Sequence, residues 1–334
     1  MAFPRTYRAY QYENFGPVEN VLTMNSSVPQ LPLKPQQVRI KVHSAALNPL
    51  DYKLIEFMGQ MMLGKAPSKQ QPFNVGFDAA GEVVEVGNNV KGLKIGDAVY
   101  TSTPLDTIGT LAEYLIVDEE FAELKPTNLE FNEAAAIASV SLTAYAGITK
   151  YSKLQEGETI LILGGSTAVG MLAIQFARVT GARVIATTST RNVELVKSLG
   201  VDQVIDYTKT KWVNILENHS VDVVYDCGVE PTAWNEGAQL VLKKNTGRLM
   251  TLLPMPKPVK ESEFGAQLIG FVSSDVTSFK KLDEITKYIE SGKVKPVIDS
   301  LYPFEKALDA FAKLKTGHAQ GKLVIQVHPQ HSEP

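Results

Sequence analysis

Short β-type runs dominate the first part of the chain, and turn residues separate them. The runs are rich in Val, Ile and Tyr and are interrupted by turn signals such as Gly87-Asn88-Asn89 and Gly96-Asp97. They predict strands at 38–42, 81–86, 98–100 and 112–117. Residues 1–125 are therefore expected to form a small, barrel-like β domain.

From about Asn132 the apolar residues take helical spacing, and strands and helices then alternate. Strands are predicted at 160–163, 184–188, 203–206, 222–226 and 247–252. Helices are predicted between them, near 169–179, 191–199, 211–218 and 231–242. Alternation of this kind indicates a doubly wound parallel α/β sheet with helices on both faces.

The last part of the chain mixes both kinds of element. In order, we predict a proline-rich loop, a strand, an amphipathic helix, a second helix and a closing strand, at 254–258, 268–272, 279–291, 304–315 and 322–327. The closing strand is expected to return to the first domain. The chain should therefore consist of two domains, one formed by 1–125 with 273–334 and the other by 126–272.

A turn of small residues, Gly164 to Gly170, joins the first strand of the alternating region to its helix. Glycine lets backbone N–H groups approach phosphate oxygens without a Cβ in the way, and the helix directs its N-terminus at the same place. The turn is not a strict GxGxxG. The strand before it, the helix after it and a second strand at the expected distance nevertheless indicate a dinucleotide site. An ordinary turn without a ligand is the alternative.

The end of the second strand indicates which dinucleotide is bound. A carboxylate there would bind the ribose 2′-hydroxyl of NAD, but the chain has Ser189 and Arg191 and no acidic residue near them. A hydroxyl and a guanidinium suit a 2′-phosphate, so the predicted cofactor is NADPH. Tyr207 could close over the adenosine side. For Arg191, a solvated surface charge is the alternative.

Polar side chains gather directly after the strand predicted at 38–42. Asn48 precedes a proline, which biases it away from helix and places it at a strand end. Asn48, Tyr52 and Lys53 could each donate a hydrogen bond to a carbonyl oxygen, as hydride addition to an enone or a quinone requires. For Asp51, the N-cap of a following helix is the favoured interpretation.

Composition mainly excludes other classes of protein. A net charge of -3 over 334 residues offers no basic footprint for nucleic acid. The single cysteine, Cys227, excludes an internal disulfide and is interpreted as a small core residue rather than a catalytic thiol. The five histidines have no zinc-ligand spacing, so no metal site is predicted. With no secretory signal and no apolar run near the ~20 residues of a membrane span, a cytoplasmic protein is expected.

Six motifs together carry a resemblance to a known family, and they lie at 48–53, 76–81, 141–145, 164–170, 189–192 and 317–322. The chain resembles the zinc-free quinone oxidoreductase branch of the medium-chain dehydrogenase/reductase superfamily. Within that branch it is similar to the NADPH-dependent enone and alkenal reductases and to the chloroplast-envelope quinone oxidoreductase homologues. The resemblance covers almost the whole chain.

The resemblance implies a GroES-like β-barrel domain, completed by the C-terminal segment, with a Rossmann domain inserted in it. Zinc-using relatives carry Gly-His-Glu where this chain has Gly76-Phe77-Asp78, and their helix cysteine falls near Ser139, so the metal ligands are expected to be missing. A homodimer or homotetramer is also implied. The implied cofactor contacts are Lys53, Thr143, Ala168, Val169, Gly170, Ser189, Arg191, Tyr207, Phe271, Val272, Ser273, Gly321 and Lys322.

The predicted activity is the zinc-independent, NADPH-dependent reduction of a quinone or an α,β-unsaturated carbonyl compound. Negative charge develops on the conjugated oxygen, and Asn48, Tyr52 and Lys53 are the predicted catalytic donors that meet it. The Met-rich segment 54–75 is expected to be a loop, either lining the substrate or lying on the surface. The alternatives are a zinc-free aldehyde or alcohol reductase and a non-catalytic, NADPH-sensing RNA-binding or stress-regulatory protein.

Overall fold

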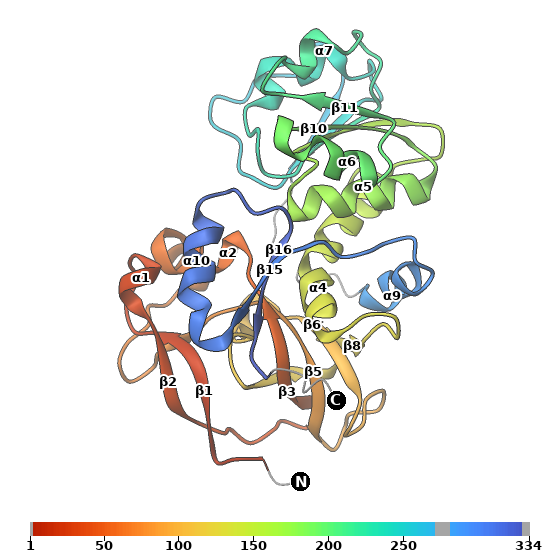
Figure 1. The fold of residues 1–334 in the computed structure, drawn as a ribbon. Helices are drawn as coiled ribbons and strands as arrows, with labels where there is room; N and C mark the ends of the chain where they lie inside the picture. Colours follow the sequence, from red (N-terminus) through yellow and green to blue (C-terminus); the bar gives the residue numbers. More distant parts are fainter. Residues whose placement is uncertain (1–2, 271–280, 329–334) are drawn as a thin grey trace. The chain divides into compact units, whose positions relative to one another are not determined.

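The computed structural model describes residues 3–270 and 281–328, which form two compact units (Figure 1). Unit 1 consists of Met1–Ser139, Lys280–Glu290 and Pro296–Pro334, and unit 2 of Val140–Phe279 and Ser291–Lys295. The first boundary between them falls inside one helix, α4 (Phe131–Ala146), rather than before it.

Unit 1 is built on a seven-stranded sheet with the order β15-β16-β3-β5-β6-β8, in which β7 pairs with β3. A three-stranded sheet with the order β2-β1-β4 accompanies it. The larger sheet contains β3 (Gln37–Ala46), β5 (Asp78–Val86), β6 (Ala98–Ser102), β7 (Tyr114–Asp118), β8 (Ala122–Leu124), β15 (Ile298–Pro303) and β16 (Lys322–Gln326). The smaller sheet contains β1 (Thr6–Tyr12), β2 (Leu22–Pro29) and β4 (Phe73–Asn74).

The predicted strands of the first domain are confirmed as β3, β5, β6 and β7. The closing strand is confirmed as β16, and it pairs antiparallel with β3, Val324 opposite Ala46, so it does return to the first domain. Strands β1, β2, β4, β8 and β15 were not predicted. In β2 most side chains are half-exposed or exposed, so no alternation marks it, and pairing with β1 holds it in place.

Short helices pack on one core in unit 1. Helix α10 (Ala307–Lys315) contacts β16 and α2 (Pro49–Lys53), as Figure 1 shows, and it buries Ala307, Ala310 and Phe311. The remaining helical elements of this unit are α1 (Val18–Val21), α3 (Gly59–Leu63), α9 (Leu282–Glu290), a π-helical turn at Leu54–Met58 and 3-10 turns at Leu105–Thr107, Glu119–Phe121 and Phe304–Lys306.

The segment after α2 was expected to be a loop, and that prediction is wrong for residues 54–63. The chain continues from α2 through the π-helical turn into α3 and stops at Gly64, which has a φ of 65°. Burial of Leu54 and Ile55 explains the helix, since two side chains of the turn enter the core.

Unit 2 contains a six-stranded, all-parallel sheet with the order β11-β10-β9-β12-β13-β14. Its strands are β9 (Thr159–Leu163), β10 (Arg183–Thr188), β11 (Gln203–Asp206), β12 (Val223–Asp226), β13 (Arg248–Thr251) and β14 (Gln267–Gly270). Numbered within the unit, the order is 3-2-1-4-5-6, the doubly wound Rossmann arrangement that was predicted. In such a sheet, ligands bind at the carboxyl ends of the strands, where the order reverses between β9 and β12.

The helices of unit 2 confirm the alternation only in part. They are α5 (Ala168–Thr180), α6 (Val193–Ser198) and α7 (Gln239–Val241), with a π-helical turn at Gly147–Tyr151 after α4, 3-10 turns at Thr190–Asn192 and Trp212–Asn214 and a π-helical turn at Trp234–Ala238. The helix predicted at 211–218 is wrong, because only one 3-10 turn forms there. The helix predicted at 231–242 is broken at Gly237, whose φ of 169° is not helical.

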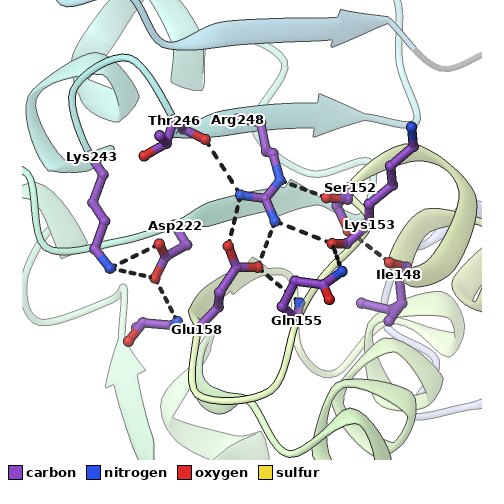
Figure 2. Close-up of polar contacts among 10 residues, drawn as sticks. Ile148, Ser152, Lys153, Gln155, Glu158, Asp222, Lys243, Thr246 and Arg248 are labelled. Atoms are coloured by element: carbon purple, nitrogen blue, oxygen red, sulfur yellow. Dashed lines mark hydrogen bonds and ion pairs between the residues drawn. The ribbon is translucent and has the colours of Figure 1, made fainter.

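Ion pairs hold the amino ends of the central strands together, as Figure 2 shows. Arg248, the first residue of β13, donates to Glu158 with an Nη1 to Oε1 distance of 3.1 Å and also to the backbone oxygen of Ser152. Lys243 Nζ lies 2.8 Å from Asp222 Oδ1. These charged groups all lie at the end of the sheet opposite to the ligand-binding edge, so they serve the fold.

In the part of the chain that the structure describes, no helix is long and apolar enough to cross a membrane.

Candidate functional site

The predicted dinucleotide turn lies between β9 and α5, and three glycines shape it. Gly164 has a φ of 81°, which a side chain would strain. A Cβ on Gly170 would lie 2.1 Å from the backbone oxygen of Gly164, and one on Gly165 would lie 2.8 Å from Cβ of Ala186. The turn therefore packs directly on its own helix and on β10, as close backbone approach to a pyrophosphate requires.

Thr167 caps α5 at the centre of this turn. Its Oγ1 accepts the Gly170 N–H at 3.0 Å and donates to the Gly164 oxygen at 2.9 Å. The cap does not use the N–H groups of Ala168 and Val169, which remain available as donors in the first turn of the helix. Together with the helix dipole, these donors favour an anion. The departure from GxGxxG is thus compensated, since a threonine cap orders the turn.

The end of β10 is tied to the same turn by hydroxyl groups. Ser166 Oγ accepts from Thr188 Oγ1 and from Asn192 Nδ2, each at 3.0 Å, and Thr187 Oγ1 accepts the Gly164 N–H at 3.0 Å. Thr187, Thr188 and Asn192 were not among the predicted cofactor contacts. Their polarity at a strand end beside the glycine turn was the available signal.

The residues predicted to select the cofactor lie just after β10. Ser189 is half-buried, and Arg191 is exposed in the 3-10 turn that follows. The exposed fraction of Tyr207 is 53%, and its N–H donates to the Thr188 oxygen at 3.0 Å. These three residues therefore stand at the carboxyl ends of two adjacent strands, where the adenosine of a dinucleotide would lie.

One expectation about this region is wrong, because an acid lies nearby. Asp206 ends β11 opposite Thr188, and its Oδ2 accepts from Thr190 Oγ1 at 2.6 Å. The hydroxyl groups of Thr190 and Thr208 hold the pKa of this carboxyl well below its usual range. Lys209 lies 3.3 Å from the same oxygen. The negative charge is thus balanced by Thr208 and Lys209 of its own loop and by Thr190 from the turn after β10, a contact that sequence spacing could not reveal.

The remaining implied cofactor contacts are placed less directly. Thr143 lies in α4, half-buried, and its backbone oxygen accepts from the Tyr225 hydroxyl at 3.2 Å. Gly321 has a φ of 126°, and a Cβ there would lie 2.4 Å from the backbone oxygen of Val297. Phe271, Val272 and Ser273 fall outside the described residues. Contact of these five residues with a cofactor stays a prediction.

A second group of polar side chains forms in unit 1, where three neighbouring strands come together. Both β5 and β16 run antiparallel to β3, and Ala46 near the end of β3 lies opposite Asp78 and Val324. Asp78 is the first residue of β5 and Lys322 is the first of β16. Both therefore lie near the end of β3, which Asn48 follows in the chain.

Asn48, Asp78, Ser139 and Lys322 form what we call the Asn48 cluster. Lys322 Nζ lies 2.9 Å from Asp78 Oδ2 and 2.6 Å from Asn48 Oδ1. Asn48 Nδ2 donates to Asp78 Oδ2 at 2.8 Å. Ser139, from α4, donates to Asp78 twice, through its hydroxyl at 2.7 Å and its N–H at 2.8 Å.

Burial divides this cluster into two layers. The side chains of Asp78 and Lys322 are 0% and 4% exposed, whereas Asn48 and Ser139 are half-buried. Taking an ion pair out of water is costly unless further hydrogen bonds compensate. Asp78 has four donors around it, which meets that condition. The side chain of Lys322 is therefore directed into the protein, and its implied contact with the cofactor stays a prediction.

Helix α2 begins at the Asn48 cluster. Asn48, with φ -124° and ψ 152°, is the N-cap, and Pro49 follows in the first turn. Asp51 is therefore not the N-cap, as was expected, but the third helical residue, and its Oδ2 accepts the Asn48 N–H at 2.6 Å. Asp51 is 1% exposed, and its Oδ1 has no hydrogen-bond partner among the described residues. Burial raises the pKa of this carboxyl to about 7, although the Asn48 N–H and Lys322 act to lower it.

Tyr52 and Lys53 complete the segment that the sequence singled out. Both are half-buried, and Tyr52 follows Asn48 by one helical turn and packs against the core of unit 1. Burial, with a smaller effect of Glu56, raises the pKa of the Tyr52 hydroxyl. Among the described residues, no hydrogen bond joins Tyr52 or Lys53 to the Asn48 cluster. Asn48 is therefore part of a hydrogen-bond network, whereas Tyr52 and Lys53 follow it in the chain and take no part in that network.

The positions of zinc ligands in related enzymes are used differently here. Asp78 and Ser139, which the resemblance aligns with such positions, bind each other, and Asp78 also binds Lys322. Within the described ranges, no group of three His, Cys, Asp or Glu side chains is arranged to hold a metal ion. Cys227 is buried directly after β12, and burial raises the pKa of its thiol well above the usual value, in keeping with a core residue.

Comparison with known proteins identifies the family. Residues 34–127 match the alcohol dehydrogenase GroES-like domain, and residues 199–325 match the zinc-binding dehydrogenase family. The chain is 41% identical to 2-methylene-furan-3-one reductase of Solanum lycopersicum and 38% identical to the chloroplastic NADPH-dependent alkenal/one oxidoreductase of Arabidopsis thaliana, in each case over 98% of this chain and 81% of the relative.

Among solved structures, the quinone oxidoreductase of Coxiella burnetii is similar, with a TM-score of 0.81 and 28% identity over 96% of this chain and 99% of that one. The GroES-like and Rossmann folds expected for the two parts of the chain are thereby confirmed. The chain belongs to the quinone and enone oxidoreductase branch of the medium-chain dehydrogenase/reductase superfamily.

Proposed function

We propose that this protein is an NADPH-dependent reductase of α,β-unsaturated carbonyl compounds and quinones. The observation that carries the proposal is identity of 41% and 38%, along nearly the whole chain, with a reductase of a methylene-furanone and an oxidoreductase of alkenals and enones. The substrates named for both relatives contain a carbon–carbon double bond conjugated to a carbonyl group. The polar residues at the start of α2 suit that chemistry.

The residues of unit 2 fit the dinucleotide. The glycine turn permits close backbone approach, and Ala168 and Val169 offer N–H donors at the N-terminus of α5. Ser189 and Arg191 would hold the 2′-phosphate through a hydroxyl and a guanidinium. When bound, NADPH supplies the hydride, while the protein provides orientation and electrostatic stabilisation.

The residues of unit 1 would stabilise the charge that hydride addition creates. The oxygen of the conjugated carbonyl becomes negative, and a donor aimed at it lowers the barrier. Asn48, Tyr52 and Lys53 are the proposed donors. Asn48 retains one amide N–H that its network does not use, and Tyr52 lies one turn along the same helix.

We further propose that the reaction needs no metal and that the protein is a cytoplasmic homodimer or homotetramer acting on a small molecule. The proposal that no metal is needed is supported by Asp78 and Ser139, which align with zinc-ligand positions but bind each other through hydrogen bonds. The oligomer is tested by light scattering, and the location by imaging of the tagged full-length chain. Relatives named as chloroplastic and mitochondrial make the location a necessary test.

Steady-state NADPH oxidation tests the activity. Three substrates of matched size are compared: an enone, the saturated ketone derived from it, and a quinone. Turnover of the enone and the quinone without the ketone is expected. Turnover of the saturated ketone in place of the enone would instead identify a carbonyl reductase. Binding of NADPH without turnover of any substrate would identify a binding protein, and the proposal would then be wrong.

A further inference from the structure

The Asn48 amide is held in one orientation by a buried ion pair. Its Oδ1 faces Lys322 and its Nδ2 faces Asp78. An ammonium group can only donate and an ionised carboxylate can only accept, so the reversed amide would oppose donor to donor and acceptor to acceptor. The two charges therefore decide which atom of the amide lies where.

This orientation leaves one N–H of Asn48 for a ligand. Nδ2 carries two hydrogens, and one of them is donated to Asp78 Oδ2 at 2.8 Å. Among the described residues, no acceptor takes the second hydrogen. Asn48 is half-buried, whereas the two charged residues that it binds are buried, so Asn48 is more accessible to solvent or a substrate than either of them.

Stability alone is a poor explanation for the ion pair. Replacing a buried pair by neutral residues of similar volume is often neutral or stabilising. Lys322 begins a strand whose next residues, Leu323, Val324 and Ile325, are almost fully buried, so an apolar residue would suit its place. The pair is brought together from positions 244 residues apart in the sequence. A role in fixing the orientation of the Asn48 amide explains why two buried charges bind this neutral group.

We propose that Lys322 and Asp78 are positioning residues that fix the Asn48 amide so that its N–H, and not its Oδ1, meets the oxygen of the conjugated carbonyl. The inference rests on the proposed reductase function. A freely rotating amide would present Oδ1 for part of the time, and an acceptor there would repel the developing negative charge. Fixing the donor in advance is how such sites gain their effect.

A mutant cycle separates this role from a structural one. The variants are Asn48→Ala, the double variant Asp78→Asn with Lys322→Met, and the triple variant that combines them. The double variant removes both charges together, so neither is left buried alone. Asn48→Ala is expected to lower kcat about 100-fold, the lower end of the loss on removing one oxyanion donor. The double variant is expected to lower kcat by about tenfold or more.

The triple variant decides the question. If the ion pair acts through Asn48, the triple variant loses no more kcat than Asn48→Ala alone, because the residues act as a unit. Losses that multiply would overturn the inference, as would an unchanged kcat or a failure to fold in the double variant. Arg39→Met with Glu85→Gln removes a different ion pair of unit 1, at 2.8 Å, in which Arg39 is buried and Glu85 is partly exposed, and is expected to leave kcat unchanged.

Binding of 4-nitrophenol with NADP⁺ gives a readout that does not depend on turnover. Its phenolate oxygen stands in for the negative oxygen of the reaction, and its absorbance reports ionisation. The wild-type protein is expected to bind the phenolate form preferentially and the double variant to lose that preference; equal preference in both would contradict the positioning role. Absence of turnover by the wild type would contradict the proposed function instead, so the two failures are distinguishable.

Discussion

The buried carboxyl of Asp51 predicts an unusual dependence of stability on pH. Only Oδ2 is hydrogen-bonded, to the Asn48 N–H at 2.6 Å, whereas Oδ1 lies buried with no partner among the described residues. Burial raises the pKa from the ordinary value of 3.8 to about 7. Ionisation of this group therefore costs more in the folded state than in the unfolded state.

The sign and size of the effect follow from that difference. Because the folded-state pKa lies above the unfolded one, the contribution of neutral Asp51 is fully present below about pH 4 and is lost as the pH rises towards about 7. A difference of about three pH units corresponds to about 4 kcal/mol at 1.36 kcal/mol per unit. Asp51→Asn, which cannot ionise, should therefore gain stability relative to the wild type over this range, by up to about 4 kcal/mol.

Urea unfolding of both proteins at pH 4.5, 6 and 8 (values chosen to span about the two pKa values) measures the difference. Asp97→Asn is the matched control, because Asp97 accepts the Lys94 N–H at 2.9 Å in the same three-residue pattern but is half-exposed. The reasoning would be refuted if the advantage of Asp51→Asn stayed constant with pH, or if it declined as the pH rose.

Three further predictions concern the cofactor and the metal. Arg191→Ala should raise KM for NADPH by about tenfold or more and leave KM for NADH unchanged. Lys197→Ala, which removes an exposed cation of α6, should change neither, and equal effects of the two variants would count against Arg191 as the phosphate ligand. Gly170→Ala should abolish NADPH binding in fluorescence titration, since its Cβ would lie 2.1 Å from the Gly164 oxygen, and retained affinity would refute the role of the turn. Prolonged dialysis against a chelator should leave kcat unchanged, and a loss restored by zinc would refute the metal-free reaction.

Local patterns predicted much of the fold because they express local physics. Glycine is needed where the chain must approach itself closely, and a buried parallel sheet needs nearly continuous apolar runs such as Ile160 to Leu163. The dinucleotide turn and the strands that flank it could therefore be placed from the sequence. Elements stabilised mainly by their partners were not predicted. Strand β2 is polar, and α3 follows a turn anchored by Leu54 and Ile55.

The candidate site likewise consists of features within short stretches of sequence and contacts between distant residues. The sequence by itself determined the glycine turn, the hydroxyl and guanidinium after β10, and the polar segment at Asn48, because each lies within one short stretch. Only the tertiary structure decided what Asn48 contacts. Strand pairing brings Lys322 and Asp78 to it from 274 and 30 residues away, and it brings Asp206 to Thr190. Register between distant strands depends on packing across the whole sheet, so a local pattern cannot specify which charges meet.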